Sequence, residues 1–162
     1  PVGILIVQHM PPMFTKSLAN RLDSLSQLTV VEAEGGEKIE GGMVFVAPGE
    51  KHLTVKKSGR EYRTLISDEP ANLLHRPSVD VMTASVARNY QHKALGVIMT
   101  GMGKDGLKGM TLMKAQGATL FAQDEESSVV YGMPKAVVDA GIADRVCPLK
   151  EMAASIVKEI DS

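Results

Sequence analysis

The stretch that decides the fold is Ala94-Leu-Gly-Val-Ile-Met-Thr100, followed directly by Gly101-Met-Gly-Lys-Asp-Gly106. The first part is an almost continuously apolar run, which predicts a strand covered on both faces of a sheet. The second part is a glycine-rich turn, and a helical pattern opens at Leu107. In an α/β protein such a turn lies at the carboxyl edge of the sheet, where these folds gather ligands and catalytic groups.

Outward from this unit, strand and helix patterns alternate along the whole chain. Apolar runs and period-two alternation predict strands, and apolar residues at helical spacing predict helices. We therefore expect an α/β fold, a three-layer, doubly wound, mostly parallel sheet with a β-hairpin insertion that turns at Ser58-Gly59. The predicted strands cover residues 2–7, 28–33, 43–47, 52–56, 60–66, 94–100, 118–122 and 145–147, and the predicted helices cover residues 13–25, 79–90, 107–115, 134–140 and 151–160.

Length and composition restrict the class of protein. The 162 residues suit one ordinary domain, and a formal net charge of −1 argues against a broad nucleic-acid-binding face. The single Cys147 forbids an internal disulfide and suits a reducing compartment. No apolar run approaches the ~18 residues of a membrane helix, so we expect a cytoplasmic protein without membrane insertion. The chain lacks an initiator Met and enters an apolar strand almost at once, which suggests a piece of a longer polypeptide.

Two side chains stand out as a pair with catalytic chemistry. His9 follows the first predicted strand, and Asp105 lies in the turn after strand 94–100. Considered singly, His9 would be interpreted as a loop histidine without a role, and Asp105 as a helix cap. Together, at one edge of one sheet, they form the general-base half of a Ser-His-Asp hydrolase, in which the carboxylate orients the imidazole.

The chain offers no obvious nucleophile for such a pair. Ser78 is predicted to cap the following helix. Ser127 and Ser128 lie in a polar loop that lacks the strand-turn-helix setting of a nucleophilic serine. Cys147 lies in an apolar strand and is expected to be inert core.

Two other kinds of site are weaker interpretations. Gly101–Gly106 formally matches a dinucleotide-binding fingerprint, with Asp124 about 20 residues on, but Asp105 would set a carboxylate against the phosphates. A metal site is not indicated, because no two histidines have ligand spacing; the four are His9, His52, His75 and His92. Apart from Met102 in the glycine turn, the methionines are expected to fill the core; these are Met10, Met13, Met99, Met110 and Met113.

Five motifs, in order, are similar to those of one known family. The chain resembles, over its whole length, the catalytic domain of the chemotaxis protein-glutamate methylesterases, the CheB family. The motifs are Gln8-His9-Met10-Pro11-Pro12-Met13-Phe14-Thr15, Ala47-Pro48-Gly49 with His52, Arg76-Pro77-Ser78-Val79-Asp80, Thr100-Gly101-Met102-Gly103-Lys104-Asp105-Gly106, and Val129-Val130-Tyr131-Gly132-Met133-Pro134.

The resemblance implies an activity and a set of site residues. It implies a cytoplasmic serine hydrolase of phosphorelay signalling, which hydrolyses γ-glutamyl methyl esters and deamidates selected glutamines on the cytoplasmic helices of chemoreceptors. By motif, the catalytic histidine falls on His9, the aspartate on Asp105, and the oxyanion donor on the backbone N–H of Met102. The resemblance implies no metal or organic cofactor.

The chain departs from the family pattern at its start. The family's nucleophilic serine lies in a Gly-x-Ser-Thr-Gly-Gly turn upstream of Gln8, and its receiver domain lies further upstream. Residues 1–162 are thus expected to be a catalytic domain without its first strand, its nucleophile and its receiver domain, and to be inactive alone. Strands 2–7 and 94–100 should border the place of the missing strand. The alternative is a non-catalytic receptor-binding segment.

Overall fold

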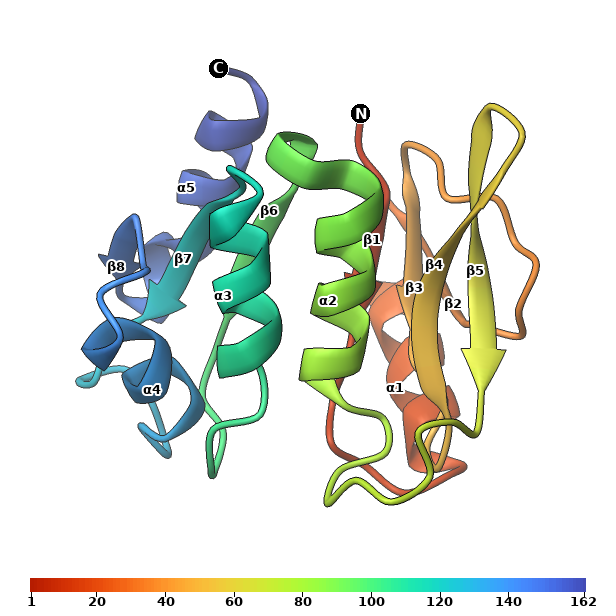
Figure 1. Cartoon of the computed structure of the whole chain (residues 1–162), viewed down its shortest axis with the longest axis horizontal. Coiled ribbons are helices and arrows are strands. Elements are labelled where there is room, and N and C mark those ends of the chain that lie inside the picture. Colours follow the sequence, from red (N-terminus) through yellow and green to blue (C-terminus); the bar gives the residue numbers. More distant parts are fainter. The chain divides into compact units, whose positions relative to one another are not determined.

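The computed structural model describes all residues, Pro1–Ser162. The chain forms two compact units, residues 1–85 and 86–162, and the division falls within α2. Every predicted strand and helix is present, with ends that differ by a few residues. The elements, drawn in Figure 1, are β1 (Ile4–Ile6), α1 (Phe14–Leu25), β2 (Thr29–Glu32), β3 (Met43–Val46), β4 (His52–Ser58), β5 (Glu61–Ser67), α2 (Val79–Tyr90), η1 (Gln91–Lys93), β6 (Leu95–Ile98), α3 (Leu107–Ala115), β7 (Thr119–Gln123), α4 (Met133–Asp139), β8 (Arg145–Cys147) and α5 (Leu149–Ile160).

A parallel three-stranded sheet organises residues 1–85. Its strand order is β1-β3-β2, and both pairings are parallel. Because side chains alternate along a strand, Val44 and Val46 of β3 lie on one face and pack with Ala19 of α1. Phe45 lies on the opposite face, where it packs with Leu53 of β4 and Met82 of α2. The sheet is therefore buried on both sides, which explains its nearly continuous apolar strands.

The hairpin insertion is confirmed, but its turn is one residue later than predicted. β4 and β5 pair antiparallel, and Ser58 lies opposite Glu61. The two-residue turn is therefore Gly59-Arg60 rather than Ser58-Gly59. Gly59 adopts φ +63°, a left-handed conformation that glycine takes without steric cost. The alternation of the strands locates the hairpin, whereas the cross-strand register decides the turn.

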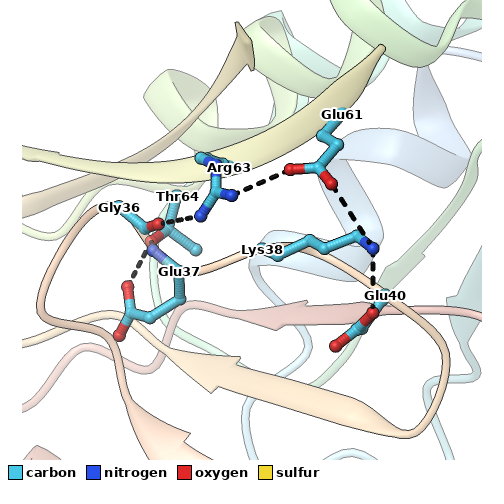
Figure 2. A network of polar contacts seen from close by, with 7 residues as sticks. All are labelled: Gly36, Glu37, Lys38, Glu40, Glu61, Arg63 and Thr64. Carbon is cyan, nitrogen blue, oxygen red and sulfur yellow. Dashed lines mark hydrogen bonds and ion pairs between the residues drawn. The ribbon is translucent and has the colours of Figure 1, made fainter. Parts of the chain in front are cut away.

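A network of polar side chains fastens residues 36–40 to β5, as Figure 2 shows. Arg63 donates to the carbonyl of Gly36 over 2.8 Å and pairs with Glu61 over 2.8 Å. The Thr64 hydroxyl donates to the carboxylate of Glu37. That carboxylate also accepts the backbone N–H groups of residues 34 and 35, each over 2.8 Å. Residues 36–40 thus lie along β5 at the edge of the hairpin, joined to it by an isolated antiparallel bridge between Lys38 and Arg63 rather than as a regular strand.

The second unit, residues 86–162, has its own parallel sheet. The strand order is β6-β7-β8, and α5 covers one face, where Met152 packs with Phe121 and Cys147. On β6, a Cβ added at Gly96 would stand 2.7 Å from Leu120 and 3.2 Å from Met110 of α3. The strand therefore needs glycine where these side chains approach.

β1 and β6 are edge strands within their sheets. β1 pairs only with β3, and β6 pairs only with β7. Each strand thus keeps one side without a strand partner in its own sheet, and the place of a further strand beside them stays a prediction.

The methionines divide between core and surface. Met110 and Met113 are 1% exposed, which confirms their expected core role. That expectation is wrong for Met13, which is 82% exposed, and for Met99, which is also exposed. Met99 directly follows β6, and Met13 is the N-cap residue of α1, so both lie where the chain has left the sheet. None of the helices combines the length and hydropathy needed to cross a membrane.

Candidate active site

His9 lines a pocket at the carboxyl end of β1. The pocket has a volume of about 330 Å³ and lies between the proline-rich segment after β1 and the loop before α2. Its lining includes two oppositely charged side chains, Glu50 and Arg76. It is lined by His9, Met10, Pro11, Pro12, Glu50, Leu74, His75, Arg76 and Pro77.

The His9 ring is stacked on His75. The ring centroids are 4.0 Å apart, and the planes differ by only 6°. The sequence alone predicts no role for His75 and indicates only that its spacing to the other histidines does not suit a metal site. It directly precedes the Arg76-Pro77-Ser78 motif, but no periodic pattern connects that loop with His9, because the two segments meet only in the folded unit.

His52 is a structural histidine that holds the same loop. It is fully buried. The backbone N–H of Ser78 donates to its Nδ1 over 3.3 Å, so the ring proton lies on Nε2, which donates to the carbonyl of Pro70 over 2.9 Å. One neutral imidazole thereby ties both ends of the loop that carries His75.

The segment after His9 is held by close backbone packing. A Cβ at Gly49 would stand 2.3 Å from the backbone nitrogen of Pro12, so only glycine fits against the proline pair. The N–H of Gly49 donates to the hydroxyl of Thr15 over 2.9 Å, and this hydroxyl donates to Glu32 over 2.7 Å. The Ala47-Pro48-Gly49 motif thus supports the position of the loop that carries His9.

The glycine turn of the second unit carries an exposed residue, Met102. The Met102 side chain is 77% exposed, and its N–H makes no hydrogen bond within the described structure. Gly103 and Gly106 adopt φ values of +85° and +108°, which only glycine adopts readily. An N–H without an internal partner in a constrained turn suits an oxyanion donor.

Hydrogen bonds hold this turn against the loop before α4. The buried Gln123 side chain accepts the N–H of Thr100 over 2.8 Å, and the N–H of Gly101 donates to Val130 over 3.0 Å. A Cβ at Gly132 would lie 2.7 Å from the carbonyl oxygen of Gly101, so this position also requires glycine. The Gly132-Met133-Pro134 motif therefore packs against the glycine turn and restricts its conformation.

Asp105 is 9% exposed and lies in the turn after β6. The N-cap position of α3 belongs to Gly106, so Asp105 stands one residue outside it. The interpretation of Asp105 as a helix cap stays a prediction, and so does its pairing with His9.

One amide of the glycine turn and one at the start of the following helix are bonded within the chain. The N–H of Gly101 donates to Val130, and the N–H of Leu107 donates to Lys104 over 3.1 Å. A pyrophosphate-binding fingerprint uses free amides at this turn and helix start. These two internal bonds disfavour the dinucleotide interpretation.

The three serines weighed as nucleophiles have structural partners. The Ser78 hydroxyl accepts the N–H of Val81 over 3.3 Å, which confirms its role as a cap of α2. The Ser127 hydroxyl donates to Asp124 over 2.5 Å and accepts the N–H of Leu149 over 2.9 Å. The Ser128 hydroxyl donates to the backbone carbonyl of Asp124. Cys147 is buried, as expected.

Known proteins match this chain over nearly its whole length. The sequence model described as CheB methylesterase matches residues 1–156. The chain is 48% identical over 160 residues to a protein-glutamate methylesterase/protein-glutamine glutaminase of Photorhabdus laumondii, covering 99% of the chain and 46% of that protein. It is 51% identical over 156 residues to one from Chromobacterium violaceum, covering 96% of the chain and 44% of that protein.

A solved structure agrees with the fold. The catalytic domain of the Thermotoga maritima CheB methylesterase superposes with a TM-score of 0.94 at 45% identity, covering 98% of this chain and 84% of that one. The protein therefore belongs to the CheB methylesterase family. It spans less than half the length of the curated relatives that it matches.

Proposed function

We propose that the full protein containing this chain is a cytoplasmic hydrolase that demethylates γ-glutamyl methyl esters, and deamidates selected glutamines, on chemoreceptor cytoplasmic helices. Residues 1–162 act as part of its catalytic domain. They supply the general base His9, the orienting carboxylate Asp105 and the oxyanion donor at Met102. The nucleophilic serine lies outside these residues, as does a receiver domain that regulates the site. No metal or organic cofactor takes part.

The mechanism follows from these roles. His9 takes the proton of the serine hydroxyl as its oxygen attacks the ester carbonyl, and Asp105 stabilises the imidazolium that forms. The N–H of Met102 binds the oxyanion of the tetrahedral intermediate. His9 then returns the proton to the leaving methoxide, so methanol departs from an acyl-enzyme. Water, deprotonated by His9, hydrolyses the acyl-enzyme to the glutamate carboxylate and free serine.

The observation that carries this proposal is the family match over residues 1–156, whose motifs fall at the two places described above. The histidine motif lines the pocket after β1. The glycine motif forms the turn after β6 with a free amide. Both turns follow strands of parallel sheets, which is where α/β folds carry their chemistry.

The test uses the full-length protein and receptor membranes with labelled methyl esters. We expect His9→Gln to lose nearly all methanol release, because the serine then lacks its base. His92→Gln is the matched control, since His92 is exposed in η1, and it should retain wild-type release. A folded His9→Gln protein with wild-type release would overturn the proposal, and receptor binding without release by the wild type would favour the non-catalytic alternative.

A further inference from the structure

The His9–His75 stack has a geometry suited to a general base. A triad histidine must direct both ring nitrogens at partners, one at the carboxylate and one at the serine hydroxyl. Both nitrogens lie in the ring plane. A neighbour that fixed the ring by a hydrogen bond would occupy one of them, whereas a neighbour stacked on the face occupies neither. At 4.0 Å and 6°, His75 contacts the face of His9 and fixes the plane of its ring.

The loop that carries His75 is itself held in place. His52 ties Pro70 and Ser78 through its two ring nitrogens. The N–H of Glu50 donates to the carbonyl of Arg76 over 3.0 Å, next to His75. The guanidinium of Arg76 donates back to the carbonyl of Asp68 over 3.2 Å. These four contacts surround a single histidine, so its ring is a firm support rather than a mobile loop side chain.

We propose that His75 is a positioning residue for His9, which holds the imidazole in the plane that the reaction needs. This inference rests on the proposed role of His9 as general base. His75 acts through the flat face of its ring, so any flat aromatic ring of similar reach should replace it. A branched aliphatic side chain fills the volume without providing that face.

The experiment compares His75→Phe with His75→Leu in the full-length protein. In His75→Leu we expect kcat to fall about tenfold or more, because a misoriented base loses its reactive geometry, while KM stays within about twofold. In His75→Phe we expect most of the kcat to return. His92→Phe and His92→Leu are the matched controls and should leave both parameters unchanged.

Proton NMR detects the stacking of His75 on His9 independently of enzyme activity. Protons of His9 that lie over the face of a stacked ring resonate upfield in proton NMR. The upfield shift should be present in the wild type and in His75→Phe, and absent in His75→Leu. Urea unfolding midpoints show that each variant is folded.

The outcomes separate this inference from the proposed function. If His9→Gln is inactive but His75→Leu keeps wild-type kcat, the positioning role is wrong and the proposed function stands. The positioning role is equally wrong if His75→Phe is as impaired as His75→Leu while the upfield shift persists. If a folded His9→Gln protein is active, the proposed function fails, whatever the NMR spectrum shows.

Discussion

The carboxylate of Asp105 is nearly buried, and its position calls for a physical explanation. At 9% exposure it is largely removed from water, and a buried carboxylate is costly unless other groups interact with it. Gly106 occupies the N-cap of α3, so Asp105 stands one residue before it. The proposed explanation is that the carboxylate orients His9.

For Asp105→Asn in the full-length protein we expect a fall in kcat of roughly 10⁴-fold, because the amide selects the wrong imidazole tautomer. Receptor binding should stay at the wild-type level, since the change is nearly isosteric. Methanol release measures the first quantity, and co-sedimentation with receptor membranes measures the second. Asp139→Asn, which alters an exposed ion pair with Lys135, is the control. Wild-type turnover by a folded Asp105→Asn protein would remove Asp105 from the triad.

At the scale of elements, Glu37 connects the segment after β2 to the hairpin. Burial raises its pKa, but hydrogen bonds from the Thr64 hydroxyl and from the N–H groups of Glu34 and Gly35 outweigh burial and hold the pKa below its ordinary 4.5. A carboxylate with a lowered pKa stabilises the fold at a pH above the unfolded value. That contribution is lost as the pH falls through the folded value.

We therefore expect Glu37→Gln to lower the urea midpoint at pH 7, and to lower it progressively less between about pH 5 and pH 3, where the wild type loses the same contribution. Midpoints measured at several pH values for both proteins test this. The exposed Glu126→Gln should track the wild type throughout. A constant difference between Glu37→Gln and wild type down to pH 3 would mean that the Glu37 charge has no part in fastening the hairpin.

Periodicity is sufficient to locate the elements but not the contacts between loops. The apolar runs correctly predict β1, β6 and their parallel neighbours, because strands covered on both faces leave an unmistakable pattern. The predicted turn of the hairpin is misplaced by one residue, since register depends on the partner strand. The stack of His75 on His9 has no local signal at all. Loop residues far apart in sequence meet only through the tertiary fold.

At the scale of the whole molecule, the proposed nucleophilic serine lies in a part of the full protein outside residues 1–162. β1 and β6 each lack a strand partner on one side. A further strand that carries the nucleophilic serine at its carboxyl end is the proposed source of the nucleophile, because catalytic groups of α/β folds gather there. In such a protein the three triad members come from separate strands.

We expect the 162-residue chain alone to release no methanol from methylated receptors above background, and the full-length protein to release it readily. The comparison uses equal molar amounts of both proteins in the membrane assay. Circular dichroism establishes that the shorter chain is folded. Turnover by the folded 162-residue chain comparable to that of the full-length protein would show that a serine within the chain is the nucleophile.

The two-residue turn of the β4–β5 hairpin is a suitable site for attaching a label. Lys57, Ser58, Gly59 and Arg60 are all exposed, and a Cβ at Gly59 would meet no atom within 4 Å. The turn lies at the opposite end of β4 from His52, about 20 Å away for a strand of seven residues. Exposed turn tips tolerate insertions well. A short epitope or a fluorophore placed at this turn would report on the location of the protein while leaving the His9 pocket untouched.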